Sequence, residues 1–295
     1  MRKPLIAGLA SIAIALLTIT TGSLSAQAQE SPPSSVEEIE AISEADPYII
    51  GGTNAAADQF PFMASIQYNK EHRCGGSLIG QDLILSAAHC FQSYIPGEYI
   101  TDVKNRRVVV GSIDVSNKDL GQAREIRSIS IQKSNDTALI RLTEPVHNIR
   151  PVQLPTPGTD ALLTPGSLAT AVGWGLTDWI MGASSSLLQH VNIPILSHEE
   201  CEVTFENEAP GYFTDEYICA GKKGSGACNG DSGGPLVKKL KNGNYIQIGV
   251  VSRGAEPCAA QGSPGIFAST SAPDFGFLGN MTQIYPKLDP EPAQP

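Results

Sequence analysis

The chain has 295 residues, of which 41% are hydrophobic and 17% are charged, and its formal net charge at pH 7 is -10. This length is sufficient for one large β domain or two small ones, and a folded region of about 250 residues hides about 70 to 75% of the surface of its unfolded chain. A chain this acidic, with no run of Lys and Arg, is not expected to bind nucleic acid or an anionic membrane.

Residues 1–28 have the pattern of a secretory signal peptide. Arg2 and Lys3 precede an apolar run from Leu5 to Ile19, and small and polar residues follow. The run has about 15 residues, whereas a membrane span needs about 20, which disfavours a membrane anchor. We expect cleavage after Ala28, export from the cell to the periplasm or the medium, and a mature chain that is not held in the membrane.

Residues 29–48 predict an acidic, solvated propeptide. They carry six carboxylates, three prolines and no basic residue, which is too polar a composition for a packed core. A short helical turn through Val36, Ile39 and Ile42 is an alternative for part of it. The sequence then changes abruptly to Ile49-Ile50-Gly51-Gly52, an apolar run whose position directly after Tyr48 needs an explanation.

From residue 49 on, the pattern predicts an all-β fold, because short β-like runs are separated by Gly, Pro, Asn and Asp. Runs at this spacing favour a sandwich or a barrel. Residues 153–167 are the candidate crossing between two halves, and residues 286–295 form a proline-rich tail. The clearest runs are residues 63–68, 77–80, 83–88, 106–111, 137–142, 168–174, 191–196, 245–252 and 265–269.

The six cysteines predict disulfides, because their number is even and an exported chain meets an oxidising compartment. No two of them form a CxxC pair, so a zinc site is not expected. Spacing alone leaves all fifteen connectivities of six cysteines open. The cysteines are Cys74, Cys90, Cys201, Cys219, Cys228 and Cys258.

Three stretches carry the candidate chemistry: "LSAAHC" with His89, "NDTALIRL" with Asp136 and "CNGDSGGP" with Ser232. Each has a structural interpretation of its own, as a core histidine, a turn aspartate or a glycine-rich turn. Together they supply a serine nucleophile, an imidazole base and a carboxylate that orients the imidazole. Their order along the chain excludes the subtilisin and α/β-hydrolase arrangements. The sequence from Ile49 to about Phe267 resembles the trypsin/chymotrypsin family of serine proteases.

The resemblance implies two antiparallel Greek-key β-barrels, with the active site in the cleft between them. The peptidase domain would span residues 49–285, with His89 and Asp136 from the first barrel and Ser232 from the second. It also implies the disulfides Cys74–Cys90, Cys201–Cys219 and Cys228–Cys258.

The same resemblance assigns the groups that bind substrate. The backbone N–H groups of Gly230 and Ser232 would form the oxyanion hole, a concave geometry that favours glycine at position 230. Ser252 would lie beside the catalytic carboxylate, and the strand from Ser252 to Gly254 would pair with an extended substrate.

The pocket for the substrate residue before the cut (P1) would have Gly226 at its floor, Ala227 beside it, and Gly254 and Gly265 in its walls. Without an acidic floor, a substrate Arg or Lys would bury an unpaired charge, so trypsin-like specificity is disfavoured. An open apolar slot favours Phe, Tyr, Leu or Met. Elastase-like preference for smaller residues is the alternative, because Ala227 and distant loops can narrow the slot.

Three departures from the family pattern limit what the resemblance implies about the remaining subsites. Arg253 stands where the family usually has tryptophan, which makes these subsites more polar and favours acidic substrate residues. The chain between Cys90 and Gly111 is longer than usual, and the approach to Asp136 is shorter.

The resemblance also explains the run at Ile49. Cleavage of Tyr48–Ile49 would free an ammonium group that folds inward and pairs with Asp231. A tyrosine before the cut differs from the Arg or Lys of many relatives, so an enzyme with this same specificity, such as another copy of the chain, would be the activator.

We therefore expect a secreted, monomeric serine endopeptidase that is made as a zymogen and acts on protein or peptide substrates. It would need no cofactor and no metal. A catalytically silent binding module of the same fold, or an esterase or acyltransferase using Ser232, are the alternative functions.

Two further sets of residues have a more ordinary interpretation. Asp114, Asp119 and Glu125 lie where some relatives bind calcium, but a solvated loop is favoured. Asn280 lies in a glycosylation sequon, and Asn135 lies in another that adjoins Asp136 and is expected to be inaccessible.

Overall fold

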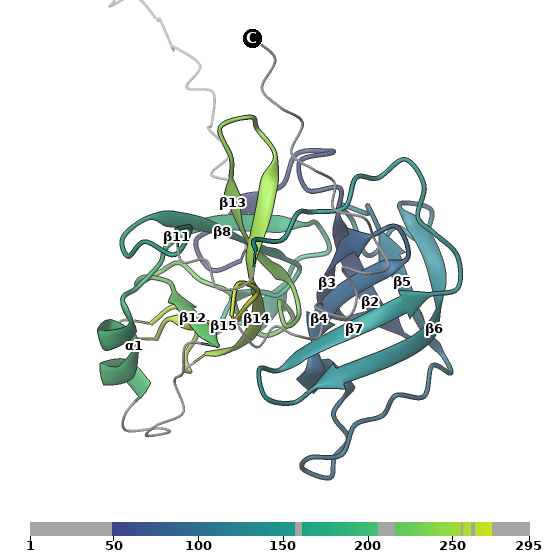
Figure 1. Ribbon diagram of the computed structural model, residues 1–295, viewed down its shortest axis with the longest axis horizontal. Helices are drawn as coiled ribbons and strands as arrows, with labels where there is room; N and C mark the ends of the chain where they lie inside the picture. The colour runs from purple at the N-terminus through teal and green to yellow at the C-terminus, as the bar shows by residue number, and fades with distance from the viewer. Residues whose placement is uncertain (1–48, 157–160, 206–215, 255, 261–262, 273–295) are drawn as a thin grey trace, which may run out of the picture. The chain divides into compact units, whose positions relative to one another are not determined.

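The computed structural model describes residues 49–156, 161–205, 216–254, 256–260 and 263–272. All of these belong to one compact unit of the chain, Glu44–Pro295. The expected signal peptide, the propeptide with Tyr48, the sequon at Asn280 and the proline-rich tail lie outside the described residues. Within them the fold is almost entirely β, with one α-helix, α1 (His198–Phe205) (Figure 1).

The first half is a closed six-stranded barrel in the order β2-β3-β4-β7-β6-β5. Strand β6 shows how one face of the barrel is buried, because Ile126 and Ile129 are buried while its other residues are partly or fully exposed. The two isoleucines are three residues apart because the register shifts between Ile126 and Ser128. The strands of the barrel are β2 (Met63–Tyr68), β3 (Glu71–Gly80), β4 (Leu83–Ala87), β5 (Arg106–Val110), β6 (Gln122–Gln132) and β7 (Thr137–Leu142).

The second half is a seven-stranded antiparallel sheet in the order β1-β11-β8-β13-β14-β15-β12. A separate hairpin is formed by β9 (Leu176–Asp178) and β10 (Ala183–Ser184). The strands of the sheet are β1 (Thr53–Asn54), β8 (Leu168–Gly173), β11 (Gln189–Pro194), β12 (Tyr217–Ala220), β13 (Pro235–Lys239), β14 (Tyr245–Gly254) and β15 (Gly265–Ser269).

Backbone contacts also join β12, at one end of this sheet, to the segment that follows β11. Leu196 N–H donates to the Cys219 carbonyl at 2.9 Å, Gly221 N–H donates to the Pro194 carbonyl at 3.0 Å, and Ile195 bridges Ala220. The chain after β11 therefore reaches β12, and the six strands β8 and β11–β15 form a ring. If the six strands of each ring are numbered 1 to 6 in chain order, their order around the ring is 1-2-3-6-5-4 in both halves.

Three clusters of buried side chains form the core: one centred in the first barrel, one in the second half and one between the halves. The first of these extends into the second half through Val172, Trp174, Leu188 and Val237. The cluster between the halves contains Leu83, Leu85 and Leu139 of the first half with Val250 and Ile266 of the second. A buried hydrogen bond of 2.6 Å from Ser77 Oγ to Gln247 Oε1 adds a polar connection between β3 and β14. Burial of both partners makes such a bond expensive to leave unmade, so it helps to fix one packing of the two halves.

The structure confirms the all-β, two-barrel expectation, and the nine predicted runs lie on β2, β3, β4, β5, β7, β8, β11, β14 and β15. The predicted crossing at residues 153–167 lies in the connection from β7 to β8. The three disulfides are Cys74–Cys90, Cys201–Cys219 and Cys228–Cys258. No helix in the described ranges is long and apolar enough to cross a bilayer.

Candidate active site

His89 and Asp136 face each other at one end of the first barrel. His89 lies in a short 3₁₀ helix, Ala88–Phe91, directly after β4, and Asp136 directly precedes β7, which pairs with β4. The His89 ring Nδ1 lies 2.8 Å from Asp136 Oδ2, and the His89 backbone N–H donates to Asp136 Oδ1 at 2.8 Å. The two bonds fix both the carboxylate and the ring, so Nδ1 carries a proton and Nε2 is left to act as a base.

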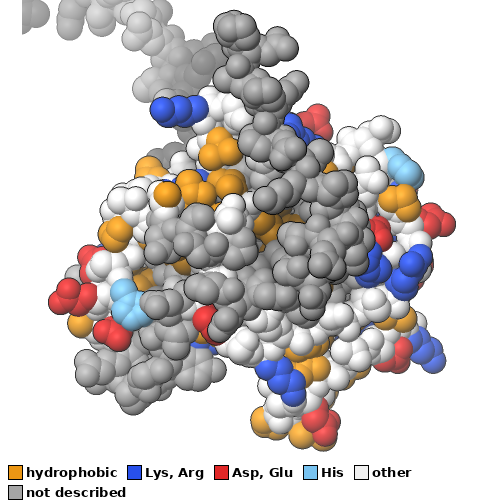
Figure 2. Space-filling view, viewed as in Figure 1, with side chains coloured by type: hydrophobic (Ala, Val, Ile, Leu, Met, Phe, Trp, Pro, Cys, Tyr) orange, Lys and Arg blue, Asp and Glu red, His pale blue; other side chains and the backbone are white. Residues whose placement is uncertain are grey.

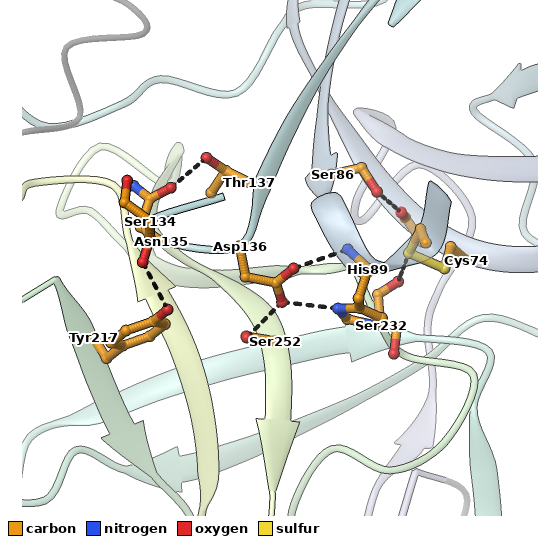
Figure 3. A network of polar contacts seen from close by, with 12 residues as sticks. Cys74, Ser86, His89, Ser134, Asn135, Asp136, Thr137, Tyr217, Ser232 and Ser252 are labelled. Atoms are coloured by element: carbon orange, nitrogen blue, oxygen red, sulfur yellow. Dashed lines mark hydrogen bonds and ion pairs between the residues drawn. A yellow bond between two sulfur atoms is a disulfide. The ribbon is translucent and has the colours of Figure 1, made fainter. Parts of the chain in front are cut away.

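The second half brings Ser252 and Ser232 to this pair. Ser252, on β14, is buried and donates its hydroxyl to Asp136 Oδ2 at 2.6 Å. Ser232 lies next to His89, with Asp136 on the other side of the imidazole (Figure 3). The Ser232 carbonyl accepts from Gly75 N–H of β3 at 2.8 Å, which ties the serine to the first barrel. The three predicted catalytic residues therefore meet at one place, and Ser252 lies beside the carboxylate as expected.

Gly230 has the backbone conformation that the oxyanion hole was predicted to need. Its φ of +97° is unfavourable for residues with a side chain, and an added Cβ would lie 2.9 Å from Gly175 Cα. Within the described part of the chain, the N–H groups of Gly230 and Ser232 donate to no protein acceptor. Two such donors can serve an incoming oxyanion.

His72 is a neighbour of Gly230 that the sequence analysis missed. Burial holds its pKa below the usual 6.5, although the bond to Gly230 partly opposes this. His72 Nε2 lies 3.2 Å from the Gly230 carbonyl oxygen and Nδ1 lies 2.9 Å from Ser65 Oγ. A neutral ring that donates from Nε2 and accepts at Nδ1 satisfies both contacts. Its only sequence signal is a histidine two residues before Cys74.

Asp231 is completely buried, and its carboxylate accepts from Gly175 N–H at 2.8 Å and Cys228 N–H at 2.9 Å. Desolvation is the larger influence and raises the pKa of Asp231 to about 6, against the lowering effect of these two bonds. No described cation forms an ion pair with it. The nitrogen of Ile49 is a peptide amide and carries no charge, so no charge among the described residues compensates this carboxylate.

The segment that starts at Ile49 packs into the second half. Ile49 is fully buried among apolar side chains that include Val191, Ile193 and Phe267. The Ile50 carbonyl accepts from Gly226 N–H at 3.0 Å. Gly51 has φ +73°, and a Cβ there would collide with the Gly224 carbonyl oxygen. This segment therefore contacts the same loop that carries the predicted pocket floor.

The predicted pocket residues come from two neighbouring segments that a disulfide joins. A Cβ added to Gly226 would meet only Ala259, at 3.5 Å. Gly254 pairs with Gly265 across β14 and β15, and Cys228–Cys258 links the two segments. Ala227 is partly buried beside the floor. No side chain projects from the floor or from this pair of wall positions.

Comparison with known proteins decides the family. The sequence model of the trypsin family matches residues 49–274. The chain is 37% identical over 236 residues to Trypsin-2 of Salmo salar, a match that covers 77% of this chain and 93% of the salmon protein. The chain belongs to the trypsin family. It is therefore a serine endopeptidase, a hydrolase that acts on protein substrates.

Arg253, the residue predicted to make the remaining subsites more polar, packs against Tyr217. Its guanidinium carbon lies 4.6 Å from the centre of the Tyr217 ring, a cation–π arrangement. Tyr217 was not among the predicted site residues, and its short strand, β12, was not predicted either. Arg253 directly follows Ser252 on β14, so a positively charged residue adjoins the one that bonds to Asp136.

Asp114, one of the three residues weighed for calcium, is held by its neighbour Ser116. The Asp114 carboxylate accepts from the backbone and the hydroxyl of Ser116 at 2.9 and 2.6 Å, which lowers the pKa of Asp114. The described residues contain no cluster of three potential ligands. Asn135 is fully buried, in agreement with the expectation that its sequon is inaccessible.

On the face in Figure 2, basic and acidic side chains lie interspersed over the described surface.

Proposed function

We propose that this trypsin-family endopeptidase is secreted as a precursor, is activated by cleavage of Tyr48–Ile49, and then cuts after large apolar or aromatic residues. The contacts from Ser252 to Asp136 and on to His89, with Ser232 beside the imidazole, carry the hydrolytic part of the proposal. These four residues come from both halves of the molecule, so both halves must be folded before the contacts can form.

In the proposed mechanism, Ser232 Oγ attacks the scissile carbonyl carbon while His89 Nε2 takes the hydroxyl proton. Asp136 holds Nδ1–H and stabilises the imidazolium that results. The carbonyl oxygen becomes negative and accepts from the N–H groups of Gly230 and Ser232. His89 then gives its proton to the leaving amine. Water repeats the sequence on the acyl-enzyme, and Ser232 regains its proton.

The glycine at position 226 supports the preference for large apolar P1 residues. No carboxylate there can pair with a substrate Lys or Arg, and desolvating an unpaired cation is costly. Gly254 and Gly265 contribute no side chain that would shorten the slot. The family alone does not decide this point, because one fold accommodates many specificities. Elastase-like specificity is the second candidate, supported by the methyl groups of Ala227 and Ala259 near the floor.

The position of Ile49 supports activation by cleavage of Tyr48–Ile49. The family match begins at residue 49, and the Ile49 side chain already lies inside the second half. A free ammonium group there would supply the charge that buried Asp231 lacks. Because the segment bonds to Gly226, its docking would order the pocket floor together with the oxyanion loop. Secretion is supported by the three disulfides and by the N-terminal pattern.

Three measurements on the secreted protein test the proposal. N-terminal sequencing should give Ile-Ile-Gly-Gly. A fluorophosphonate probe should label Ser232 only after residues 29–48 have been removed, with Ser232→Ala as the unlabelled control. Peptides that vary only at P1 should be cut fastest after Tyr, Phe, Leu or Met.

The possible outcomes separate the alternatives. Absence of labelling in the cut form would favour a silent binding module, and ester turnover without peptide turnover would favour an esterase or acyltransferase. Fastest cleavage after Ala would favour elastase-like specificity. If a Ser232→Ala precursor is still cut after Tyr48 in its native host, another enzyme performs the activation.

A further inference from the structure

The turn that carries Asp136 has an unusual backbone. Residues 133–136 connect β6 to β7, and Gln132 pairs with Thr137 across the base of this turn. Asp136 has φ +54°, a left-handed conformation that is uncommon for residues other than glycine. Such a conformation persists only where the surrounding structure holds it. The contacts of this turn therefore matter for the position of the carboxylate.

The first barrel holds one side of the turn. Ala88 N–H donates to the Asp136 carbonyl at 3.0 Å, and Thr137 Oγ1 donates to Asn135 Oδ1 at 2.7 Å. Asn135 and Thr137 are fully buried. These bonds tie the turn to the barrel that also carries His89, but they do not relate it to the half that carries Ser232.

Tyr217 holds the other side of the turn from the second half. Its hydroxyl donates to the Ser134 carbonyl at 3.2 Å, two residues before Asp136 (Figure 3). The Tyr217 side chain is buried, and the Arg253 guanidinium covers its ring. The ring is therefore fixed in place, and its hydroxyl is a defined point of attachment and not a mobile surface group.

We propose that Tyr217 is a positioning residue for Asp136. Ser252 attaches the carboxylate itself to the second half, and Tyr217 attaches the turn behind it. With only one attachment to the second half, the turn could still rotate relative to that half. Two attachments set both the position and the direction of the carboxylate relative to the half that carries Ser232. Alignment of His89 with Ser232 depends on that direction, because the two residues come from different halves. This inference rests on the proposed role of Asp136.

The test compares Tyr217→Phe with Tyr245→Phe in the activated enzyme. The first change removes only the hydroxyl that reaches Ser134. Tyr245 is a partly buried tyrosine at the start of β14 whose ring packs against Phe60 and Phe62, and its hydroxyl makes no hydrogen bond within the described residues. It therefore controls for the loss of a phenolic hydroxyl in the second half of the molecule.

We expect Tyr217→Phe to lower kcat about 3- to 10-fold, which corresponds to the loss of one hydrogen bond, with KM changed less than about twofold. The far-downfield proton resonance of the His89–Asp136 hydrogen bond should broaden or move in this variant. Neither quantity should change in Tyr245→Phe. A purely structural role would instead lower the melting temperature and leave kcat of the folded fraction and the resonance unchanged.

An unchanged kcat and an unchanged resonance in Tyr217→Phe would overturn the inference, as would equal effects in both variants. Asp136→Asn separates this failure from a failure of the proposed mechanism, because it should cost about 10⁴-fold in kcat if Asp136 orients His89. Full activity of Asp136→Asn would remove the basis of both proposals. A large loss there, with Tyr217→Phe unaffected, would overturn only the role of Tyr217.

Discussion

The two halves of the molecule share one strand order but contribute to the site in different ways. In the first, His89 and Asp136 lie at the ends of paired strands, next to the barrel's own hydrogen bonds. In the second, Gly226, Gly230 and Ser232 lie in the connection between β12 and β13. That connection is held by Asp231 and by the segment from Ile49. The same topology thus supports a part held by the barrel's own strands and a part that bonds to the segment from Ile49.

The difference also separates two kinds of burial. The Asp136 carboxylate of the first half is well supplied with hydrogen-bond donors, because it accepts from His89 and from Ser252. Asp231 is more deeply buried and has only two backbone donors among the described residues. Burial of a poorly compensated charge is costly, so the second half of the uncut chain carries an energetic penalty that a cation can remove.

The largest predicted effect tests whether the two halves form one catalytic unit. His89→Ala from the first half and Ser232→Ala from the second should each lower kcat by about 10⁴- to 10⁶-fold. The double variant should be no worse than either single one, because each change already disables the same step. The measurement is kcat for a peptide substrate with tyrosine at P1. Losses that multiply would show that the halves act separately.

A smaller effect is expected from a charge placed in the second half alone. Gly226→Asp should lower kcat/KM for Tyr and Phe peptides by about 10²-fold, because it buries a carboxylate against an apolar ring. Labelling of Ser232 by a small fluorophosphonate, which does not fill the pocket, should remain within about threefold. Equal loss of both activities would mean that the substitution disrupts the loop and not the pocket.

The pH dependence of stability should distinguish the uncut chain from the cut one. Unfolding returns Asp231 to its ordinary pKa of 3.8, and the folded value is about 6. Between these values the folded state binds more protons, so stability of the uncut chain should fall as pH rises from about 4 to about 6. The total change corresponds to about 3 kcal/mol.

After the cut, the Ile49 ammonium should lower the pKa of Asp231, and the sign should reverse. Stability from the ion pair is then present above the unfolded pKa of the carboxyl and is lost on acidification through the lower folded value. Denaturant unfolding of both forms between about pH 2 and about pH 7 measures this, with Asp231→Asn as the control that should remove the difference. Parallel profiles for the two forms would contradict the pairing.

The sequence was sufficient to predict the residues that short motifs define. His89, Asp136 and Ser232 each lie in a stretch whose neighbours constrain the backbone, and the structure brings all three together. The short β-like runs likewise predicted nine strands. Strand β6 was missed because its face outside the barrel is polar, which leaves only Ile126, Ile129 and Ile131 as its apolar signal.

Contacts between distant segments could not be predicted in the same way. His72 reaches Gly230 across 158 residues, and Tyr217 reaches Ser134 across 83, so neither contact leaves a local pattern. Helix α1 did have a signal, because Ser197 and Glu200 form a reciprocal capping box. The stretch "SHEE", residues 197–200, contains this motif, but the sequence analysis predicted no helix there.

The smallest predicted effect compares two glycines with the same backbone and different surroundings. Gly51 has φ +73° and lies against the Gly224 carbonyl, whereas Gly97, in the first half, has φ +80° and nothing within 4 Å of an added Cβ. Alanine should strain both backbones by about 1 to 2 kcal/mol. Only Gly51→Ala also displaces the segment that bonds to Gly226, so it alone should lower kcat/KM, by about 10- to 30-fold.

The rate of fluorophosphonate labelling of Ser232 in the cut enzyme shows where the loss arises. In Gly51→Ala the rate of labelling should fall by about the same factor as kcat/KM, because the docked and undocked states of the segment exchange and only the docked state reacts. Gly97→Ala should keep the labelling rate of the unaltered enzyme. Similar losses in both variants would mean that the second half does not depend on the Ile49 segment more than the first half does, and the expected contrast between the barrel-held part of the site and the part that depends on this segment would then be wrong.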